Sequence, residues 1–179
     1  PPASCARSDA VAVTLRDATG ADLPAILAIH NSTIDDTTTT WADEDETIEH
    51  RTEWFAARQA AGDPVVVAVD GGEVVGFTAW AWFRGEGKWP GYRHTRELSV
   101  HVRDSHRGHG VGRLLLDDLV ERAARHDVHV LVAAVDSGNA TSIRFHEQMG
   151  FVEVARLPEV GRKFDQWLDL VLLQRIIEP

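Results

Sequence analysis

Residues 100–112, which read V-H-V-R-D-S-H-R-G-H-G-V-G, constrain the fold of this chain more than any other segment. An apolar strand ends there, glycines follow at every second position, and an amphipathic helix begins near Val111. Glycines let backbone N–H groups approach an anion closely, and a helix start adds unpaired donors and the positive end of a dipole. The segment therefore predicts a phosphate-binding turn between a strand and a helix.

The glycine spacing narrows the class of phosphate ligand. The R-x-x-G-x-G pattern from Arg107 to Gly112 lacks the lysine and Ser/Thr of a P-loop, and it also differs from the G-x-G-x-x-G of dinucleotide-binding folds. The pattern fits the pyrophosphate of coenzyme A better than either nucleotide motif. For the glycines taken alone, a tight turn without any ligand is the alternative, because glycine motifs by themselves are weak signals.

Charge and composition exclude several classes of partner. The 179 residues carry a formal net charge of −10, which argues against nucleic acid and against an anionic membrane surface. A coenzyme A site then needs a local positive patch, which Arg103, Arg107 and Arg113 provide. No apolar run is long enough to span a membrane, and no Cys/His spacing indicates a metal site.

The cysteine count and the N-terminal residues bear on compartment and domain organisation. Cys5 is the single cysteine, so an intrachain disulfide is impossible and a reducing cytoplasm is expected. Residues 1–10 lack the basic start and apolar stretch of a secretion signal and are expected to form a disordered tail. Residues 11–179 contain no linker or repeat and are expected to form one domain.

Hydrophobic periodicity predicts the element order β-α-α-β-β-β-α-β-α-β-β. Helices are expected at 23–29, 47–61, 111–125 and 140–149, and strands at 11–16, 65–69, 74–83, 95–102, 128–135, 151–157 and 167–176. A central hairpin followed by a β-α-β-α unit implies the α/β class, with a mixed sheet of about six to seven strands and helices on both faces.

Three finer expectations follow from the same patterns. The inner face of the helix at 111–125 is expected to carry Leu114, Leu115, Leu119 and Val120. The last two strands are expected to be joined by a turn near Gly161. Segments 31–46 and 84–93 are expected to be loops, and a loop as long as the first is usually functional or mobile.

Motifs beyond the glycine turn resemble the GNAT superfamily of acetyl-CoA-dependent N-acetyltransferases. Besides R-G-H-G-V-G, the chain has N-A-T-S-I-R-F-H-E-Q-M-G-F at 139–151, which is similar to the superfamily's N-x-x-(A/S)-x-x-(F/L)-Y-E-K-x-G-F pattern. E-L-S-V-H-V at 97–102 and G-R-K-F-D-Q-W-L-D-L-V-L-L-Q at 161–174 resemble its phosphinothricin and methionine sulfoximine N-acetyltransferases. The likeness covers about residues 12–176. It implies a GNAT fold, acetyl-CoA as cosubstrate, the α-amino group of a small amino acid as acceptor, and a homodimer.

The resemblance also implies which residues contact the coenzyme. The backbones of Val100 and Val102 would pair with the pantetheine arm like an added strand, residues 108–113 would hold the pyrophosphate, and Asn139 would bind the pantetheine chain. A plain helix cap is the alternative for Asn139, since one side chain could not easily do both. The complete implied set is Val100, His101, Val102, Arg107, Gly108, His109, Gly110, Val111, Gly112, Arg113 and Asn139.

Two residues are implied to be catalytic. Glu97 would be the general base, because an ammonium must lose a proton before it attacks a thioester; a half-exposed polar strand face is its alternative. His146 stands where most of the superfamily carries a tyrosine that protonates the departing thiolate, and it follows the phosphinothricin group instead. A core-edge histidine is its alternative, and its role as acid or base is open. With Cys5 the only cysteine, no covalent intermediate is expected.

Substrate residues are implied with less specificity. A zwitterionic substrate needs a cation for its carboxylate, and the resemblance favours Arg84 over Lys88. The implied substrate set is Trp41, Arg84, Tyr92, Leu98 and Ser99, while Trp167 and Lys163 have weaker support. Two alternatives stay open: a GNAT enzyme that acts on a polyamine, a peptide N-terminus or a lysine side chain, and a non-catalytic acyl-CoA-binding sensor.

Overall fold

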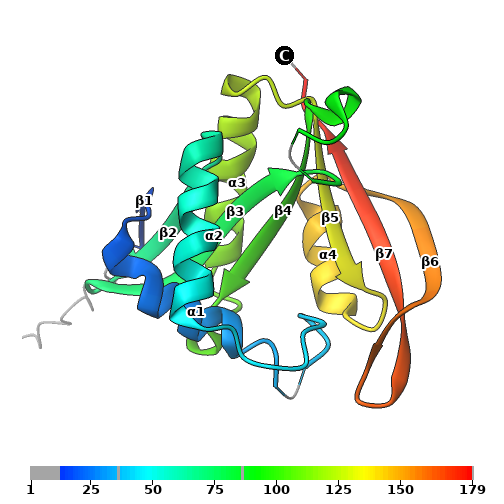
Figure 1. Ribbon diagram of the computed structural model, residues 1–179, viewed down its shortest axis with the longest axis horizontal. Helices are drawn as coiled ribbons and strands as arrows, with labels where there is room; N and C mark the ends of the chain where they lie inside the picture. Colours follow the sequence, from blue (N-terminus) through cyan, green and yellow to red (C-terminus); the bar gives the residue numbers. More distant parts are fainter. Residues whose placement is uncertain (1–12, 36, 86, 179) are drawn as a thin grey trace, which may run out of the picture.

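The computed structural model describes residues 13–35, 37–85 and 87–178 and shows a seven-stranded sheet covered by helices on both faces (Figure 1). The expected N-terminal tail lies outside the described residues. The strands are β1 (Thr14–Asp17), β2 (Val65–Asp70), β3 (Glu73–Trp82), β4 (Thr95–Val102), β5 (Val130–Asp136), β6 (Val152–Lys163) and β7 (Gln166–Ile176). The helices are α1 (Leu23–Asn31), α2 (Ile48–Ala61), α3 (Val111–Arg125) and α4 (Ala140–Gln148). The predicted order and the predicted mixed sheet are confirmed.

Strand order in the sheet is β1-β2-β3-β4-β5-β7-β6, and only β4 and β5 run parallel. Helices α1 and α2 cover one face, where Ile26 and Phe55 pack on Phe77. Helices α3 and α4 cover the other, where Leu119 packs on Leu131. Strands covered on both faces read as continuous apolar runs, which explains the V-V-V-A-V of β2.

The inner face of α3 differs from the expectation at one position. Leu114 is 44% exposed, whereas Leu115, Leu116 and Leu119 are completely buried. The buried positions of the helix begin at Val111 and recur close to every fourth residue, and this stripe leaves Leu114 on its solvent side.

The turn expected near Gly161 is wrong. Gly161 lies inside β6, opposite Leu168, and the chain reverses at Phe164 and Asp165, which both have positive φ. An ideal Cβ on Gly161 would overlap ring carbons of Trp41. Glycine is required there because an indole from the segment between α1 and α2 packs directly on the strand, not because the chain turns.

Strands β4 and β5 separate partway along their length. Their pairing ends at Glu97 and Val132, although β4 continues to Val102 and β5 to Asp136. The other edge of β5 stays paired with β7 over the whole strand. The sheet is therefore split from residue 98 onward, and Figure 1 shows the two strands diverging toward the end where α3 and α4 begin. We call this opening the β4–β5 split.

Candidate active site

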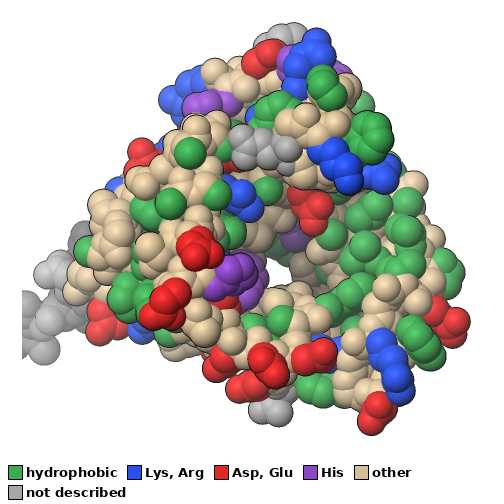
Figure 2. Space-filling view, viewed as in Figure 1, with side chains coloured by type: hydrophobic (Ala, Val, Ile, Leu, Met, Phe, Trp, Pro, Cys, Tyr) green, Lys and Arg blue, Asp and Glu red, His purple; other side chains and the backbone are tan. Residues whose placement is uncertain are grey.

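The face of the molecule shown in Figure 2 is hollowed at its centre. In the same orientation, Figure 1 places α2 and β4 on one side of the hollow and β5, β6 and β7 on the other, so the hollow lies over the β4–β5 split. Acidic, basic and histidine side chains border it. Groups on both faces of the sheet can therefore reach one molecule bound in this opening.

Backbone groups of β4 face into the split. The Arg103 N–H donates to the Val75 carbonyl of β3 at 2.8 Å. Successive N–H groups of a strand point to opposite sides, so those of Val100 and Val102 point away from β3 and into the split. Because the pairing with β5 has ended at Glu97, this stretch of β4 offers a strand edge to an extended ligand.

The glycine turn presents backbone donors at the start of α3. Gly108 and Gly110 have φ of 77° and 86°, and Gly110 is the N-cap residue, without a side-chain cap. The first N–H groups of α3 therefore have no partner within the helix. Gly112 differs, since it is helical and a Cβ there would only touch Phe145 at 3.5 Å. The predicted phosphate-binding geometry thus depends on two of the three glycines.

The positive patch beside this turn is weaker than the sequence suggests. Arg107 pairs with Asp104 at 2.8 Å and donates its Nε to the Val102 carbonyl at 3.2 Å. Arg103 pairs with Glu73 at 3.0 Å. Arg113 lines a groove between α3 and the end of α4. The turn therefore presents unpaired backbone donors, whereas Arg103 and Arg107 already have acidic partners.

Glu97 lies in a cavity between α2 and the sheet. The cavity has a volume of about 280 Å³ and is lined by Trp54, Arg58, Ala79, Trp80, Ala81, Trp82, Glu97, Leu98 and Ser99. Burial raises the pKa of the Glu97 carboxyl group, because the surrounding protein replaces part of its water shell. A carboxylate with a raised pKa is a better proton acceptor. Glu97 is nevertheless exposed to solvent, as its alternative interpretation expected, so water can also reach the carboxyl group.

His146 is buried in α4 between two phenylalanine rings. Its Nδ1 lies 2.8 Å from the Ser142 carbonyl oxygen, an acceptor, so Nδ1 carries the proton. Its Nε2 is buried and has no hydrogen-bond partner among the described residues. Burial lowers the pKa of His146. The resting side chain is therefore neutral, and its one available group is an acceptor at Nε2.

Asn139 caps α4, as its alternative interpretation expected. Its Oδ1 accepts a hydrogen bond from the Ser142 N–H at 3.0 Å. The amide Nδ2 is the group left to donate elsewhere. Asn139 also lines a cavity of about 660 Å³ beside the end of β5, together with residues of the segment before α2 and of the β6–β7 hairpin.

His101, one of the predicted coenzyme residues, lies opposite Phe77 of β3, so its backbone groups point to β3 and not into the split. Its ring stacks on Phe77 with centroids 4.9 Å apart and meets the edge of the His30 ring at 5.6 Å. This environment lowers the pKa of His101 to about 3, chiefly through burial. The side chain thus packs toward α1 as a neutral core residue.

The predicted substrate residues separate into two groups. Leu98 and Ser99 line the cavity of Glu97. Trp41 lies elsewhere, on Gly161, and the Arg84 guanidinium lies 5.8 Å from the Tyr92 ring, on the connection between β3 and β4. None of these three side chains lines the Glu97 cavity. Trp167 is 61% exposed on β7 and is therefore not a core aromatic.

Sequence reasoning missed Trp54 and Arg58, which line the cavity from α2. Their spacing of four residues places them on one helix face, and an aromatic followed by a cation on an inner face was the available signal. It also understated Lys163, whose buried Nζ donates to the carbonyls of Ile34, Thr37 and Thr40 and so fastens the segment before α2 to β6.

Two further properties of the described part of the chain bear on the earlier expectations. Its helices are too short or too polar for any of them to cross a bilayer. Residues 13–35, 37–85 and 87–178 contain no cluster of three or more His, Cys, Asp or Glu side chains that could hold a metal ion.

Comparison with known proteins agrees with this geometry. Residues 26–151 match the acetyltransferase (GNAT) family. An L-methionine sulfoximine/L-methionine sulfone acetyltransferase of Pseudomonas paraeruginosa is 44% identical over 94% of this chain and 97% of its own length. A phosphinothricin N-acetyltransferase of Alcaligenes faecalis is 38% identical over 92% of this chain and 82% of its own length. The structure of yncA, a putative acetyltransferase from Salmonella typhimurium with its cofactor acetyl-CoA, superimposes with a TM-score of 0.88 at 40% identity and covers 93% of this chain and 94% of that one. The chain belongs to the acetyltransferase (GNAT) family.

Proposed function

We propose that this protein transfers the acetyl group of acetyl-CoA to the α-amino group of a small amino acid of the methionine sulfone, methionine sulfoximine or phosphinothricin type. The observation that carries the proposal is the position of Glu97, which lies in a cavity at the point where β4 and β5 separate. The similar acetyltransferases of Pseudomonas paraeruginosa and Alcaligenes faecalis support this choice of substrate.

The β4–β5 split and the glycine turn suit the coenzyme. Backbone groups of Val100 and Val102 can pair with the amides of a pantetheine arm, and amides from Gly108 to Arg113 can bind the pyrophosphate. Asn139 follows the end of β5, and its Nδ2, which the helix cap does not use, can donate to the arm. The bound coenzyme supplies an activated acetyl thioester.

Glu97 takes up the proton that the substrate ammonium must lose, directly or through water. The Val102 N–H then stabilises the negative charge that develops on the acetyl oxygen during attack. Because Cys5 is the single cysteine, the proposed transfer is direct and forms no covalent enzyme intermediate.

His146 acts first as an acceptor in this proposal. Neutral, with its proton on Nδ1, it has no proton to give from Nε2. Its Nε2 can accept a proton released during attack and return it to the sulfur of the departing thiolate. The buried, unpartnered Nε2 supports this assignment, because such an atom is costly unless a ligand or water satisfies it.

The assembly and location are also proposed. Exposed apolar side chains gather over β6 and β7 (Figure 2), at an edge of the sheet; they are Val152, Val154, Val160, Phe164, Trp167 and Ile176. We propose that this hairpin forms a homodimer contact, and sedimentation that gives a monomer at micromolar concentration would contradict it. A cytoplasmic location and the absence of nucleic-acid and membrane partners stay predictions.

A thiol-release assay with acetyl-CoA tests the function. L-Methionine sulfone, phosphinothricin, spermidine and a short peptide serve as acceptors. We expect turnover with the two amino acids and little with the others. Preferred turnover of spermidine or the peptide would replace the substrate class with a polyamine or peptide amine. Saturable acetyl-CoA binding without thiol release from any acceptor would indicate a sensor instead.

A further inference from the structure

We propose that Arg58 of α2 binds the α-carboxylate of the amino-acid substrate. This inference rests on the proposed function and names the cation that selects amino acids over other amines. It differs from the assignment implied by the resemblance, in which Arg84 has this role.

On one face of α2, two arginine side chains contact the ring of one tryptophan. Arg51, Trp54 and Arg58 are three and four residues apart and so share a helix face. The guanidinium carbons of Arg51 and Arg58 lie 4.6 Å and 5.5 Å from the Trp54 ring. The indole therefore holds both guanidinium groups in place through cation–π contact.

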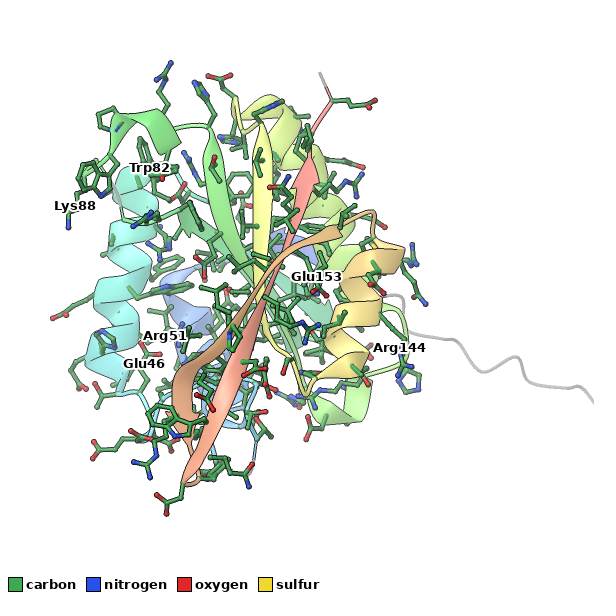
Figure 3. The ribbon with its side chains drawn as sticks, turned by 90° about the vertical axis from the view of Figure 1, so that its right-hand side faces the viewer. Glu46, Arg51, Trp82, Lys88, Arg144 and Glu153 are labelled. Carbon is green, nitrogen blue, oxygen red and sulfur yellow. The ribbon has the colours of Figure 1, made fainter. Side chains whose placement is uncertain are left out.

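The two arginines differ in their partners. Arg51 is 4% exposed and pairs with Glu46, beside which it lies in Figure 3. Arg58 makes no ion pair with any carboxylate of the described residues, and its Nε is buried without a hydrogen-bond partner. The Nε of Arg51 is likewise buried without a partner, so the ion pair is what separates the two arginines. Arg51 already has a carboxylate partner and Arg58 has none in the described part of the chain, so Arg58 is the member of the group that is prepared for an external anion.

Arg58 and Glu97 line the same cavity from opposite sides, one from α2 and one from β4. An α-amino acid carries its ammonium and carboxylate on one carbon atom. A cavity of about 280 Å³ with one carboxylate and one guanidinium in its wall matches that pair of charges. Binding of the carboxylate by Arg58 directs the amino group toward Glu97, and the lining residue Trp54 offers its indole to the apolar part of the side chain.

Other arginines near the cavity are less suited to this role. Arg96 is buried and pairs with Asp63 at 3.3 Å. Arg84 stacks on Tyr92 and does not line the cavity. The geometry thus selects Arg58 among these three.

Steady-state kinetics with L-methionine sulfone and its carboxamide test the assignment. The amide keeps the amino group and the side chain but lacks the carboxylate charge. We expect the wild-type enzyme to have a KM for the free acid lower than for the amide by about 10- to 100-fold, the range for a charged hydrogen-bonded pair. Arg58→Met should remove this preference by raising the KM of the free acid alone. Arg58→Lys should restore part of it, because the charge remains and the planar fork is lost.

Acetyl-CoA affinity and thermal stability of each variant report on folding, and Arg125→Met, an exposed arginine of α3, is the matched control. Equal losses for acid and amide in Arg58→Met, or a selective loss in Arg84→Met instead, would overturn the assignment while leaving the proposed function intact. If Arg58→Met does not fold, the wild-type enzyme still tests the assignment. Equal KM values for the acid and the amide would overturn the assignment of Arg58 without affecting the proposed function. Absence of turnover with every amino acid would defeat both proposals.

Discussion

Glu97 and Val132 form the last pair of residues that joins β4 to β5, and beyond this pair the two strands separate. The same glutamate lines the cavity under α2. One residue thus stands at the junction of the opening proposed for the coenzyme and the cavity proposed for the amine. This position explains why the pKa of its carboxyl group matters for the reaction.

Replacing Glu97 tests its role as the base. Glu97→Gln keeps the size of the side chain and removes the proton acceptor, so kcat should fall by about 10²- to 10⁴-fold, while the Kd for acetyl-CoA is unchanged. In the wild type, kcat/KM should decrease as the pH falls through the raised pKa of Glu97, because the protonated carboxyl group cannot accept a proton. Glu121→Gln on α3 is the exposed control. A wild-type rate and pH profile in Glu97→Gln would remove this residue from the mechanism.

The glycine turn allows a matched pair of substitutions. Gly110→Ala places a Cβ on a residue with φ of 86°, which costs about 1–2 kcal/mol and tilts the first amides of α3. We expect a lower Tm and a higher Kd for acetyl-CoA, measured by calorimetry. Gly112→Ala adds a Cβ at an ordinary 3.5 Å from Phe145 and should leave stability nearly unchanged. Equal behaviour of the two variants would contradict the account of the turn.

Lys163 controls the segment between α1 and α2. Lys163→Met leaves three backbone carbonyls without their donor, so unfolding should become easier by roughly 1–3 kcal/mol. Limited proteolysis should cut residues 31–46 faster, and the KM for the amine should rise more than that for acetyl-CoA. Arg162→Met, next to it on β6 and paired with Asp165 near the hairpin turn, is the control. Unchanged proteolysis would show that the segment is held by other contacts.

His101 predicts an acid limb in stability. Its folded-state pKa is about 3, whereas an unfolded chain protonates near pH 6.5. The folded state therefore binds this proton less readily than the unfolded chain does. The contribution of neutral His101 to the free energy of unfolding is complete above pH 6.5 and is lost as the pH falls toward 3. The slope is about 1.4 kcal/mol per pH unit for one group. His101→Phe, which keeps a ring on Phe77, should flatten the urea-unfolding profile between pH 6.5 and 5, unlike His109→Gln in the exposed turn.

Local patterns carried most of the fold prediction. The bounds of β4 and α3 match the expected ranges, because alternation and the 3.6-residue period are properties of neighbouring residues. The role of Gly161 could not be predicted in this way. A glycine is needed there because the ring of Trp41, which is distant in the chain, packs against it. The turn at Phe164 and Asp165 also escaped notice, because aspartate tolerates positive φ but phenylalanine is not a usual turn residue, and no glycine marks the position.

The candidate site likewise contains features that are local in sequence and features that only folding brings together. The glycine turn and the strand before it are contiguous in sequence, so the role proposed for them could be predicted from one motif. Arg58 reaches the Glu97 cavity only because α2 packs across β3 and β4. Lys163 acquires its role from carbonyls in a segment far away along the chain. Such contacts between distant elements require the folded structure.

Hydrogen–deuterium exchange of the backbone amides, with and without acetyl-CoA, tests the central claim most directly. If the β4–β5 split holds the coenzyme arm and the glycine turn holds its pyrophosphate, binding should slow exchange at Val100, Val102 and residues 108–113. Amides of the hairpin between β6 and β7 should be unaffected by acetyl-CoA. Protection confined to other parts of the sheet, with unchanged exchange at Val100 and Val102, would contradict the account.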